Sequence, residues 1–340
     1  MGPLSVSKSF LAAASARALG LLALALLSAF PATSQAQISP AQAAAIRDVI
    51  GARVEAMTIL GGDFGLSDGN FHSTGALGAQ GADVDTTVTK IGGYGDVGDP
   101  VPLGDTNIGW QPHLQGNMGY VESSDHVETA ELAGDTSKLR TFAIEFGGGA
   151  RFWTSQNLSF APTVMGLFGH TDDTYYAYSE FGRQNLPQLR QLGLADWSVD
   201  TWSLRPALNA QYIVRLGRTL VTFSSDPTGF FTHGFDRSNV NEKVGGNSGF
   251  VTDKVDIDIP LDIELYGHEL RTGGYLSRTD LFGDLKEGLA AQHLNEIHAR
   301  LVLDFLNQLW KVQWLGVGAS YLWGTAISGW TVGADVTFRF

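Results

Sequence analysis

The chain contains no cysteine, and after its N-terminal region it contains no long uncharged apolar run. None of its 340 residues is Cys, so disulfide bonds do not contribute to the fold. A membrane-spanning helix needs about 20 consecutive apolar residues, and no segment after residue 36 provides them. The two absences exclude a disulfide scaffold and a helical membrane protein.

Positive charge is also scarce. The chain has 22 Lys and Arg residues against 35 Asp and Glu residues, which gives a formal net charge of -13. This balance argues against nucleic acid as a partner. Glycine, in contrast, is abundant at 42 residues, and the 8 Trp and 9 Tyr residues suit the aromatic girdles of a membrane β-barrel. A large secreted β-sandwich is the alternative class.

Residues 1–36 have the features of a secretory signal peptide. Lys8 and Arg17 precede residues 18–30, an uncharged run of mostly Leu and Ala that is too short to span a membrane. The small-x-small sequence Ser34-Gln35-Ala36 follows. The pattern predicts export and cleavage near Ala36.

The C-terminal residues 330–340 alternate strictly between apolar and small or polar side chains. In a β-strand this places one set on each face. The apolar set is Trp330, Val332, Ala334, Val336, Phe338 and Phe340. A strand with an apolar face toward lipid and a terminal Phe is typical of the closing strand of a bacterial outer-membrane barrel.

The same period of two recurs along the chain in segments long enough to cross a bilayer as tilted strands of about 9 to 11 residues. The predicted strands are 55–68, 83–93, 106–121, 140–153, 157–170, 198–215, 218–226, 251–265, 268–282, 295–306, 311–323 and 328–340. An open sheet edge would leave backbone groups unsatisfied in lipid. The pattern therefore predicts an all-β fold, a closed antiparallel transmembrane β-barrel of about twelve strands.

Short and long connections alternate between these strands, as they do between the periplasmic turns and external loops of outer-membrane barrels. The long ones are 122–139, 171–197, 227–250 and 283–294. An even number of strands then places both chain termini in the periplasm. Four prolines, at positions 112, 162, 206 and 260, fall on the predicted lipid face, where barrels tolerate them best at bulges.

Residues 40–58 do not alternate. Ile46, Val49, Ile50, Val54 and Met57 recur at helical spacing. The predicted organisation is therefore a signal peptide (1–36), a short N-terminal helical segment (37–54) and an outer-membrane barrel (55–340). The helix either lies in the lumen as a plug or remains a periplasmic or fraying leader, and the sequence leaves both open.

Together these features resemble a known family. They are the pre-barrel helix, about twelve strands, the terminal Phe340, and Gly148-Gly149-Ala150-Arg151-Phe152-Trp153 leading through a tight turn into Leu158-Ser159-Phe160-Ala161-Pro162. The chain is similar to the β-barrel translocator domain of autotransporters, and more closely to the solitary autotransporter-like barrels. The family pattern is a secreted passenger, a helix threading the pore and then the barrel. This sequence departs from it, because the stretch between Ala36 and the first predicted strand is too short for a folded passenger.

The resemblance also implies partners. They are outer-membrane lipid and, during biogenesis, periplasmic chaperones and the barrel-assembly machinery, which would recognise the last strand through Trp330, Phe338 and Phe340. No nucleic acid and no cofactor are expected. The sequence leaves the oligomeric state open.

Charged side chains fall on the predicted lumen face of several strands. The acidic set is Glu145, Asp200, Asp256, Asp258, Asp262, Glu264, Asp304 and Asp335, and the basic set is Arg151, Arg205, Arg215, Lys254, Arg300 and Arg339. In a narrow barrel we expect these groups to pair across strands and fill the interior. A ring of charges that selects ions is the alternative.

Motifs for chemistry are weak. Gly65-Leu66-Ser67-Asp68-Gly69 matches a nucleophile elbow but lacks the following helix, and the glycines at 93–98 precede a Pro-rich loop in place of a phosphate-binding helix. A barrel enzyme would need sites such as His170 with Asp172 and Asp173, or His233 with Asp236. Asp172, Asp173 and Glu180 carry oxygen ligands suited to Ca²⁺, at a spacing that fits no defined loop.

The predicted function is a narrow or plugged channel or structural barrel with the 171–197 and 227–250 loops displayed outside. A barrel protease or lipase with a site at the external rim, and a surface adhesin or scaffold, are the alternatives. We expect no catalytic residues and no bound metal.

Deleting Phe340 should lower the amount of folded protein in the outer membrane, because the assembly machinery would lose its terminal recognition residue. The measurement is the heat-modifiable folded fraction in isolated outer membranes. Unchanged levels would contradict the assigned role.

Overall fold

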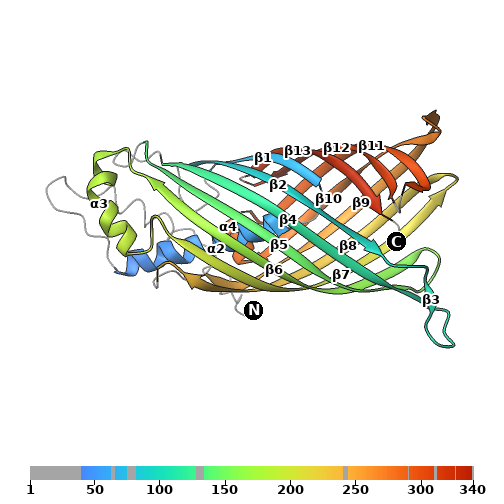
Figure 1. Cartoon of the computed structure of the whole chain (residues 1–340), viewed down its shortest axis with the longest axis horizontal. Coiled ribbons are helices and arrows are strands. Elements are labelled where there is room, and N and C mark those ends of the chain that lie inside the picture. The colour runs from blue at the N-terminus through green and yellow to red at the C-terminus, as the bar shows by residue number, and fades with distance from the viewer. Residues whose placement is uncertain are drawn as a thin grey trace, which may run out of the picture.

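The computed structural model describes residues 40–62, 66–74, 82–127, 134–239, 244–289, 291–309, 312–325 and 327–338. Figure 1 shows a helix enclosed by a long, tilted antiparallel barrel. The elements are α2 (Pro40–Gly62), β1 (Leu66–Thr74), β2 (Ala82–Asp96), β3 (Val101–Pro102), β4 (Gly109–Val127), β5 (Thr136–Trp153), β6 (Leu158–Tyr176), α3 (Glu180–Gln191), β7 (Ser198–Leu216), β8 (Thr219–Arg237), β9 (Gly245–Leu265), β10 (His268–Gly283), α4 (Asp284–Gly288), β11 (His293–Leu309), β12 (Val312–Gly324) and β13 (Ile327–Phe338).

The barrel closes through β1, which pairs with β2 on one side and with β13 on the other. Leu66 lies opposite Ala334, and Ser73 lies opposite Ile327. We call the end of the barrel with the short turns, such as the one between β7 and β8, the turn end, and the end with the α3 loop the loop end. Among the described strands, the two-residue strand β3 pairs only with β4, in a hairpin at the turn end. The predicted closed barrel of twelve strands is confirmed, with β3 as an addition.

The first predicted strand is wrong over most of its length. Residues 55–62 continue α2, and β1 begins only at Leu66. The helix therefore also runs past the predicted segment end at residue 54. The reason is visible in its packing, because Ala52, Ala56 and Ile59 recur at helical spacing and all three are buried. The apolar residues of this short segment are compatible with the period of a helix and with the period of a strand.

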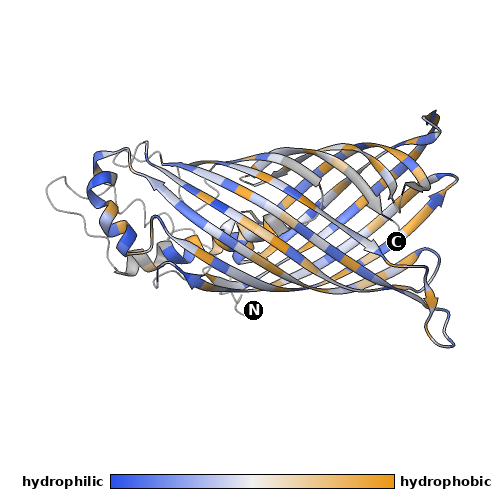
Figure 2. Cartoon of the chain, in the orientation of Figure 1, coloured by the Kyte–Doolittle hydropathy of each residue, from blue (hydrophilic) through white to orange (hydrophobic). Residues whose placement is uncertain are grey.

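The outer face of the barrel is apolar. Along β13 and β5, Trp330, Val332, Ile144 and Phe146 are exposed, whereas Glu145 between the last two is buried. Figure 2 shows the resulting alternation of apolar and polar residues along the strands. The placement of Pro260 on the lipid face is wrong, because Pro260 lies opposite the buried Arg271. It sits beside a bulge, since Ile263 pairs with Leu270. Within that bulge Asp262 has a φ of 54°.

Paired polar and charged side chains on the outer face mark where the apolar band ends. His170 Nδ1 lies 2.5 Å from Asp200 Oδ1, and Arg140 Nε donates to Glu122 Oε2 at 3.2 Å. Ion pairs do not sit in hydrocarbon, so this level is the loop-end boundary of the membrane. The placement of Asp200 in the lumen is wrong, because Asp200 lies on the same side of β7 as the exposed Trp202.

The chain enters the lumen from the loop end. Near the start of α2, Arg47 Nη1 donates to the carbonyl oxygen of Leu192 at 3.0 Å, and Leu192 follows α3 in the β6–β7 loop. Figure 1 shows α2 beginning beside α3 and the chain's C-terminal end at the opposite end of the barrel. α2 therefore begins at the loop end, whereas β1 starts on the side of the barrel where β13 ends. The chain termini themselves, which the sequence places in the periplasm, lie outside the described residues. No helix in the described ranges is long and apolar enough to cross a membrane.

The position of the apolar band is testable with two arginines on one strand face. Val164 and His170 both point outward from β6. His170 lies at the assigned loop-end boundary, and Val164 lies six residues away from it on the same face, inside the apolar band. Val164→Arg should cost about 2 to 4 kcal/mol and His170→Arg about 0 to 1 kcal/mol, because the cost of Arg falls toward the interface. Urea unfolding of the protein refolded into liposomes measures both. Equal costs would contradict the assigned boundary.

Candidate functional site

The loop half of the lumen is filled by α2. Residues 51–59 of the helix are buried on every side. Val54 packs against Trp197, Val199 and Val244, and Met57 packs against Val88 and Val121. A helix that is buried all round has no face left for solvent, so α2 is enclosed by the barrel over this layer.

Two charged side chains of α2 point into this packed layer. Arg53 is 6% exposed; its Nη2 donates to Ser123 Oγ at 2.8 Å, and its guanidinium forms a two-pronged ion pair with Asp125 on β4. Glu55 is 1% exposed and accepts a hydrogen bond from Thr232 Oγ1 at 3.2 Å. These contacts fix the rotation and the depth of the helix.

The short helix α4, in the β10–β11 loop, folds over α2. A Cβ added to Gly288 would lie 2.3 Å from the carbonyl oxygen of Ala52 and 3.0 Å from Ala56 Cβ, so glycine permits the close approach. Leu285 and Leu289 join Ala56 and Ile59 in an apolar cluster. The two helices together form the closing layer of the lumen.

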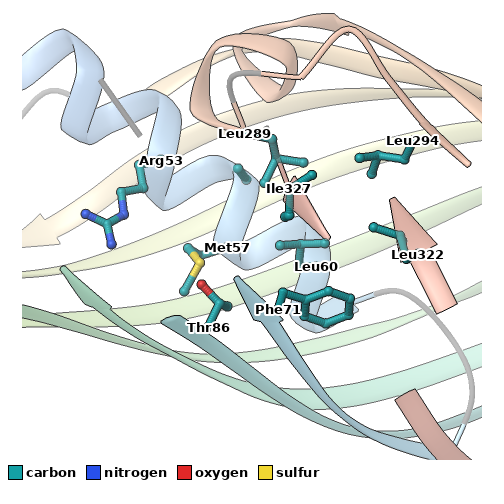
Figure 3. Close-up of a pocket in the computed structure, with 10 residues that line it drawn as sticks. Arg53, Met57, Leu60, Phe71, Thr86, Leu289, Leu294, Leu322 and Ile327 are labelled. Atoms are coloured by element: carbon teal, nitrogen blue, oxygen red, sulfur yellow. The ribbon is translucent and has the colours of Figure 1, made fainter. Parts of the chain in front are cut away.

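A small apolar cavity of about 50 Å³ remains beside this layer (Figure 3). Figure 3 shows Met57 and Leu60 of α2 facing Phe71, Leu322 and Ile327 of the barrel wall. Small-molecule sites usually occupy about 300 to 1,000 Å³. The cavity is therefore a packing gap and not a substrate site.

Below α2, paired charges cross the turn half of the lumen. Arg205 Nη1 on β7 donates to Glu145 Oε1 on β5 at 2.5 Å, with both side chains buried. Arg300 Nη2 donates to Asp256 Oδ1 at 2.6 Å. The other pairs are Arg151 with Asp96 at 3.0 Å, Arg271 with Asp258, and Arg271 with Asp304 at 4.0 Å.

The remaining members of the predicted lumen set lie elsewhere or outside the described side chains. Arg215, Asp262 and Glu264 are exposed near the short turns, where Asp262 pairs with Arg218. They lie in the last residues of β7 and β9, at the end of the barrel wall. The Asp335 side chain and all of Arg339 are outside the described part of the chain. Lys254 Nζ lies 5.2 Å from the centre of the Tyr275 ring.

The candidate catalytic groups are not brought together in a cleft. His170 contacts Asp172 at 3.2 Å and Asp200, but all three lie on the outer face. Asp173 is buried on the opposite face of β6, where it accepts from Ser137. His233 packs against Trp202, 6.3 Å between ring centres. Within the described residues no group of three His, Cys, Asp or Glu side chains could hold a metal ion.

The sequence-predicted Ca²⁺ set is also dispersed. Asp172 faces outward beside His170, Asp173 faces inward, and Glu180 pairs with Arg183 on α3 at 2.8 Å. The three carboxylates therefore belong to different surroundings, and the structure does not bring them together as ligands of one cation.

The proposed assembly-signal residues are only partly described. Trp330 is exposed on the outer face, Phe338 ends β13 without a described side chain, and Phe340 lies outside the described residues. Sequence reasoning missed the Arg53 and Glu55 contacts and the whole of α4. Charged residues inside a helical apolar pattern were the available signal for the first two.

Comparisons with known proteins agree with this architecture. A family model described as the solitary outer membrane autotransporter beta-barrel domain matches residues 100–333. The transport unit of the autotransporter AIDA-I from Escherichia coli is similar, with 7% identity and a TM-score of 0.51 over 80% of this chain and 88% of that one. The translocator domain of NalP from Neisseria meningitidis has 11% identity and a TM-score of 0.50 over 90% and 100%.

A third similar structure is the β domain of the Bordetella autotransporter BrkA. It has 14% identity and a TM-score of 0.49, over 81% of this chain and 96% of that one. At these identities the structural likeness shows the fold alone. No curated protein matches the chain by sequence.

The buried Glu145–Arg205 pair should contribute strongly to stability. Arg205→Ala removes the cation from the buried Glu145 carboxylate and leaves it the neutral amide donors of Asn117 and Gln115, which costs about 3 to 5 kcal/mol. Arg218→Ala is the matched control, because Arg218 is largely exposed at the turn end, and it should cost about 0 to 1 kcal/mol. The free energy of unfolding in urea measures both. A cost below that of the control would refute the assigned role.

Proposed function

Since the chain belongs to the family of solitary outer-membrane autotransporter β-barrels, we propose that it is a narrow channel whose resting state is closed by α2. The observation that carries this proposal is the continuous burial of residues 51–59 inside the barrel. Barrels of this size are wide enough to leave a lumen unless something fills it.

The barrier to flow lies in the loop half. Near the turn end, the Tyr94 ring lies 5.9 Å from the buried His113 ring, and Tyr94 is nevertheless 47% exposed. This exposure supports a lumen that is open to solvent at that end. The paired charges above it are polar groups of the kind that line aqueous barrels, whereas the α2 layer is packed with apolar side chains. Removing α2 would join the two ends.

The test is planar-bilayer conductance of the refolded mature protein with and without residues 37–62. Deletion should produce conductance or raise it, because α2 fills the lumen. Deletion of residues 180–191, which form α3 outside the lumen, is the matched control and should leave the conductance unchanged. Silence in both the parent and the α2-deleted barrel would overturn the channel proposal.

A surface scaffold is the second candidate, and one observation favours it. Asp135 is fully buried and accepts from the backbone of Tyr178 at 2.7 Å and from Ser179 Oγ at 2.8 Å. It also accepts from Tyr175 Oη at 2.8 Å. These bonds hold the α3 loop in one shape at the outer surface, as a displayed recognition loop requires.

We assign no catalytic role in this proposal. The His170 cluster sits on the convex outer wall at the membrane boundary, where no cleft encloses a substrate. General acid or base catalysis needs a positioned substrate within hydrogen-bond reach, and this wall does not provide one.

A further inference from the structure

Two carboxyl groups, one from α2 and one from α4, meet above Gly246 of β9. A Cβ added to Gly246 would lie 1.6 Å from Asp284 Oδ2 and 3.3 Å from Glu55 Oε2. Glycine is therefore the residue that leaves room for both. Asp284 begins α4, and its partner Glu55 lies at the level of Thr232, next to the loop-end boundary of the membrane.

The surroundings of Glu55 stabilise a shared proton and not two charges. From β8 it receives the Thr232 hydroxyl, which also contacts Ser203 Oγ at 2.8 Å. From β9 it is faced by Ser248, whose hydroxyl oxygen accepts from the Leu285 amide at 2.9 Å.

The charged groups nearest to this pair point elsewhere. Arg53, on α2 itself, is directed at Asp125 and Ser123 of β4. On α4, the side chains of Lys286 and Glu287 are exposed. Two carboxyl groups in contact, with no neutralising cation directed at them from the described side chains, cannot both ionise cheaply.

We propose that Glu55 and Asp284 form a proton-dependent latch, in which a proton held between the two carboxyl groups fastens α2 to α4 and its loss loosens α2 from the lumen. The latch is inferred from the contact between the two carboxyl side chains. Its effect on ion conduction rests on the channel function proposed above. The Gly288 contact with Ala52 and Ala56 supplies the apolar part of the same interface.

The direction of the pH effect follows from the protonation of the docked state. Burial, aided by Asp284, raises the pKa of Glu55 from an ordinary 4.5 to about 7, and burial also raises the pKa of Asp284. The binding of α2 to α4 is therefore strongest at a pH below the pKa that Glu55 has when α2 is released. It weakens as the pH rises toward the higher pKa that Glu55 has when α2 is bound in the lumen. For Glu55 the docking constant falls about tenfold per pH unit between these values, roughly 300-fold in all.

The absence of native cysteine allows a single thiol to report on α2. Val54 is fully buried in the docked helix, so Val54→Cys should react with a charged methanethiosulfonate only when α2 leaves. The labelling rate is measured in the refolded full barrel between pH 4.5 and 7.5 and is divided by the rate in the urea-unfolded protein, which corrects for thiol ionisation. We expect the corrected rate to rise at least tenfold over this range.

Three further variants locate the cause. With Val54→Cys present, Glu55→Gln should abolish most of the rise, because the amide keeps its hydrogen bonds without titrating, and Asp284→Asn should reduce it. Glu287→Gln is the matched control on α4 and should retain the full rise. A corrected rate that does not change with pH, or a rise that persists in Glu55→Gln, would overturn the latch.

The latch and the channel fail in different measurements. If labelling depends on pH through Glu55 while the α2-deleted barrel is silent, the latch stands and the channel proposal falls. If the α2-deleted barrel conducts while labelling of the parent is independent of pH, the channel proposal stands and the latch falls.

Discussion

The structure depends on backbone hydrogen bonding between β1 and β13. In lipid no water can satisfy a free strand edge, so the sheet has to close. The pairing of Leu66 with Ala334 through Ser73 with Ile327 completes that closure. Once twelve strands are joined in a ring, the width of the interior is fixed by geometry. Eight strands leave room only for side chains, and twelve leave a lumen that has to be hydrated or filled.

The lumen of this barrel is occupied in two different ways along the barrel axis. In the loop half, α2 and α4 bring apolar side chains into the lumen and exclude water. In the turn half, no helix is present among the described residues, and Arg and Asp or Glu side chains from different strands neutralise one another. A buried ion pair contributes less to net stability than its geometry suggests, so we regard these pairs mainly as a means of keeping the lower wall polar without leaving isolated charges.

Much of the barrel was predictable because a half-buried strand has a short, strict period. The alternation in β7 and β13 follows directly from lipid on one side and the lumen on the other. The boundary between α2 and β1 was not predictable in this way. Ala52 through Ile59 is apolar enough for a membrane strand and spaced well enough for a helix, and only its enclosure by the barrel decides between them.

The contacts that define the candidate site were harder to foresee. Glu55 and Asp284 are far apart in the sequence and belong to elements whose positions depend on the finished barrel. Asp200 was assigned to the lumen because it is charged, although it shares a side of its strand with Trp202. At the level of the lipid headgroups, the face toward which a side chain points is set by its odd or even position in the strand and not by its charge.

The direction of α2 has a consequence for the order of assembly. The helix descends from the loop end, and residues 63–65 alone separate it from β1, which forms one side of the closing seam. The other side is β13, the last strand of the chain. The ring therefore cannot be completed until the whole barrel sequence is available, and by then α2 is already tethered beside the seam. A segment tethered there is enclosed when the barrel closes around it, and it does not have to thread through a finished pore.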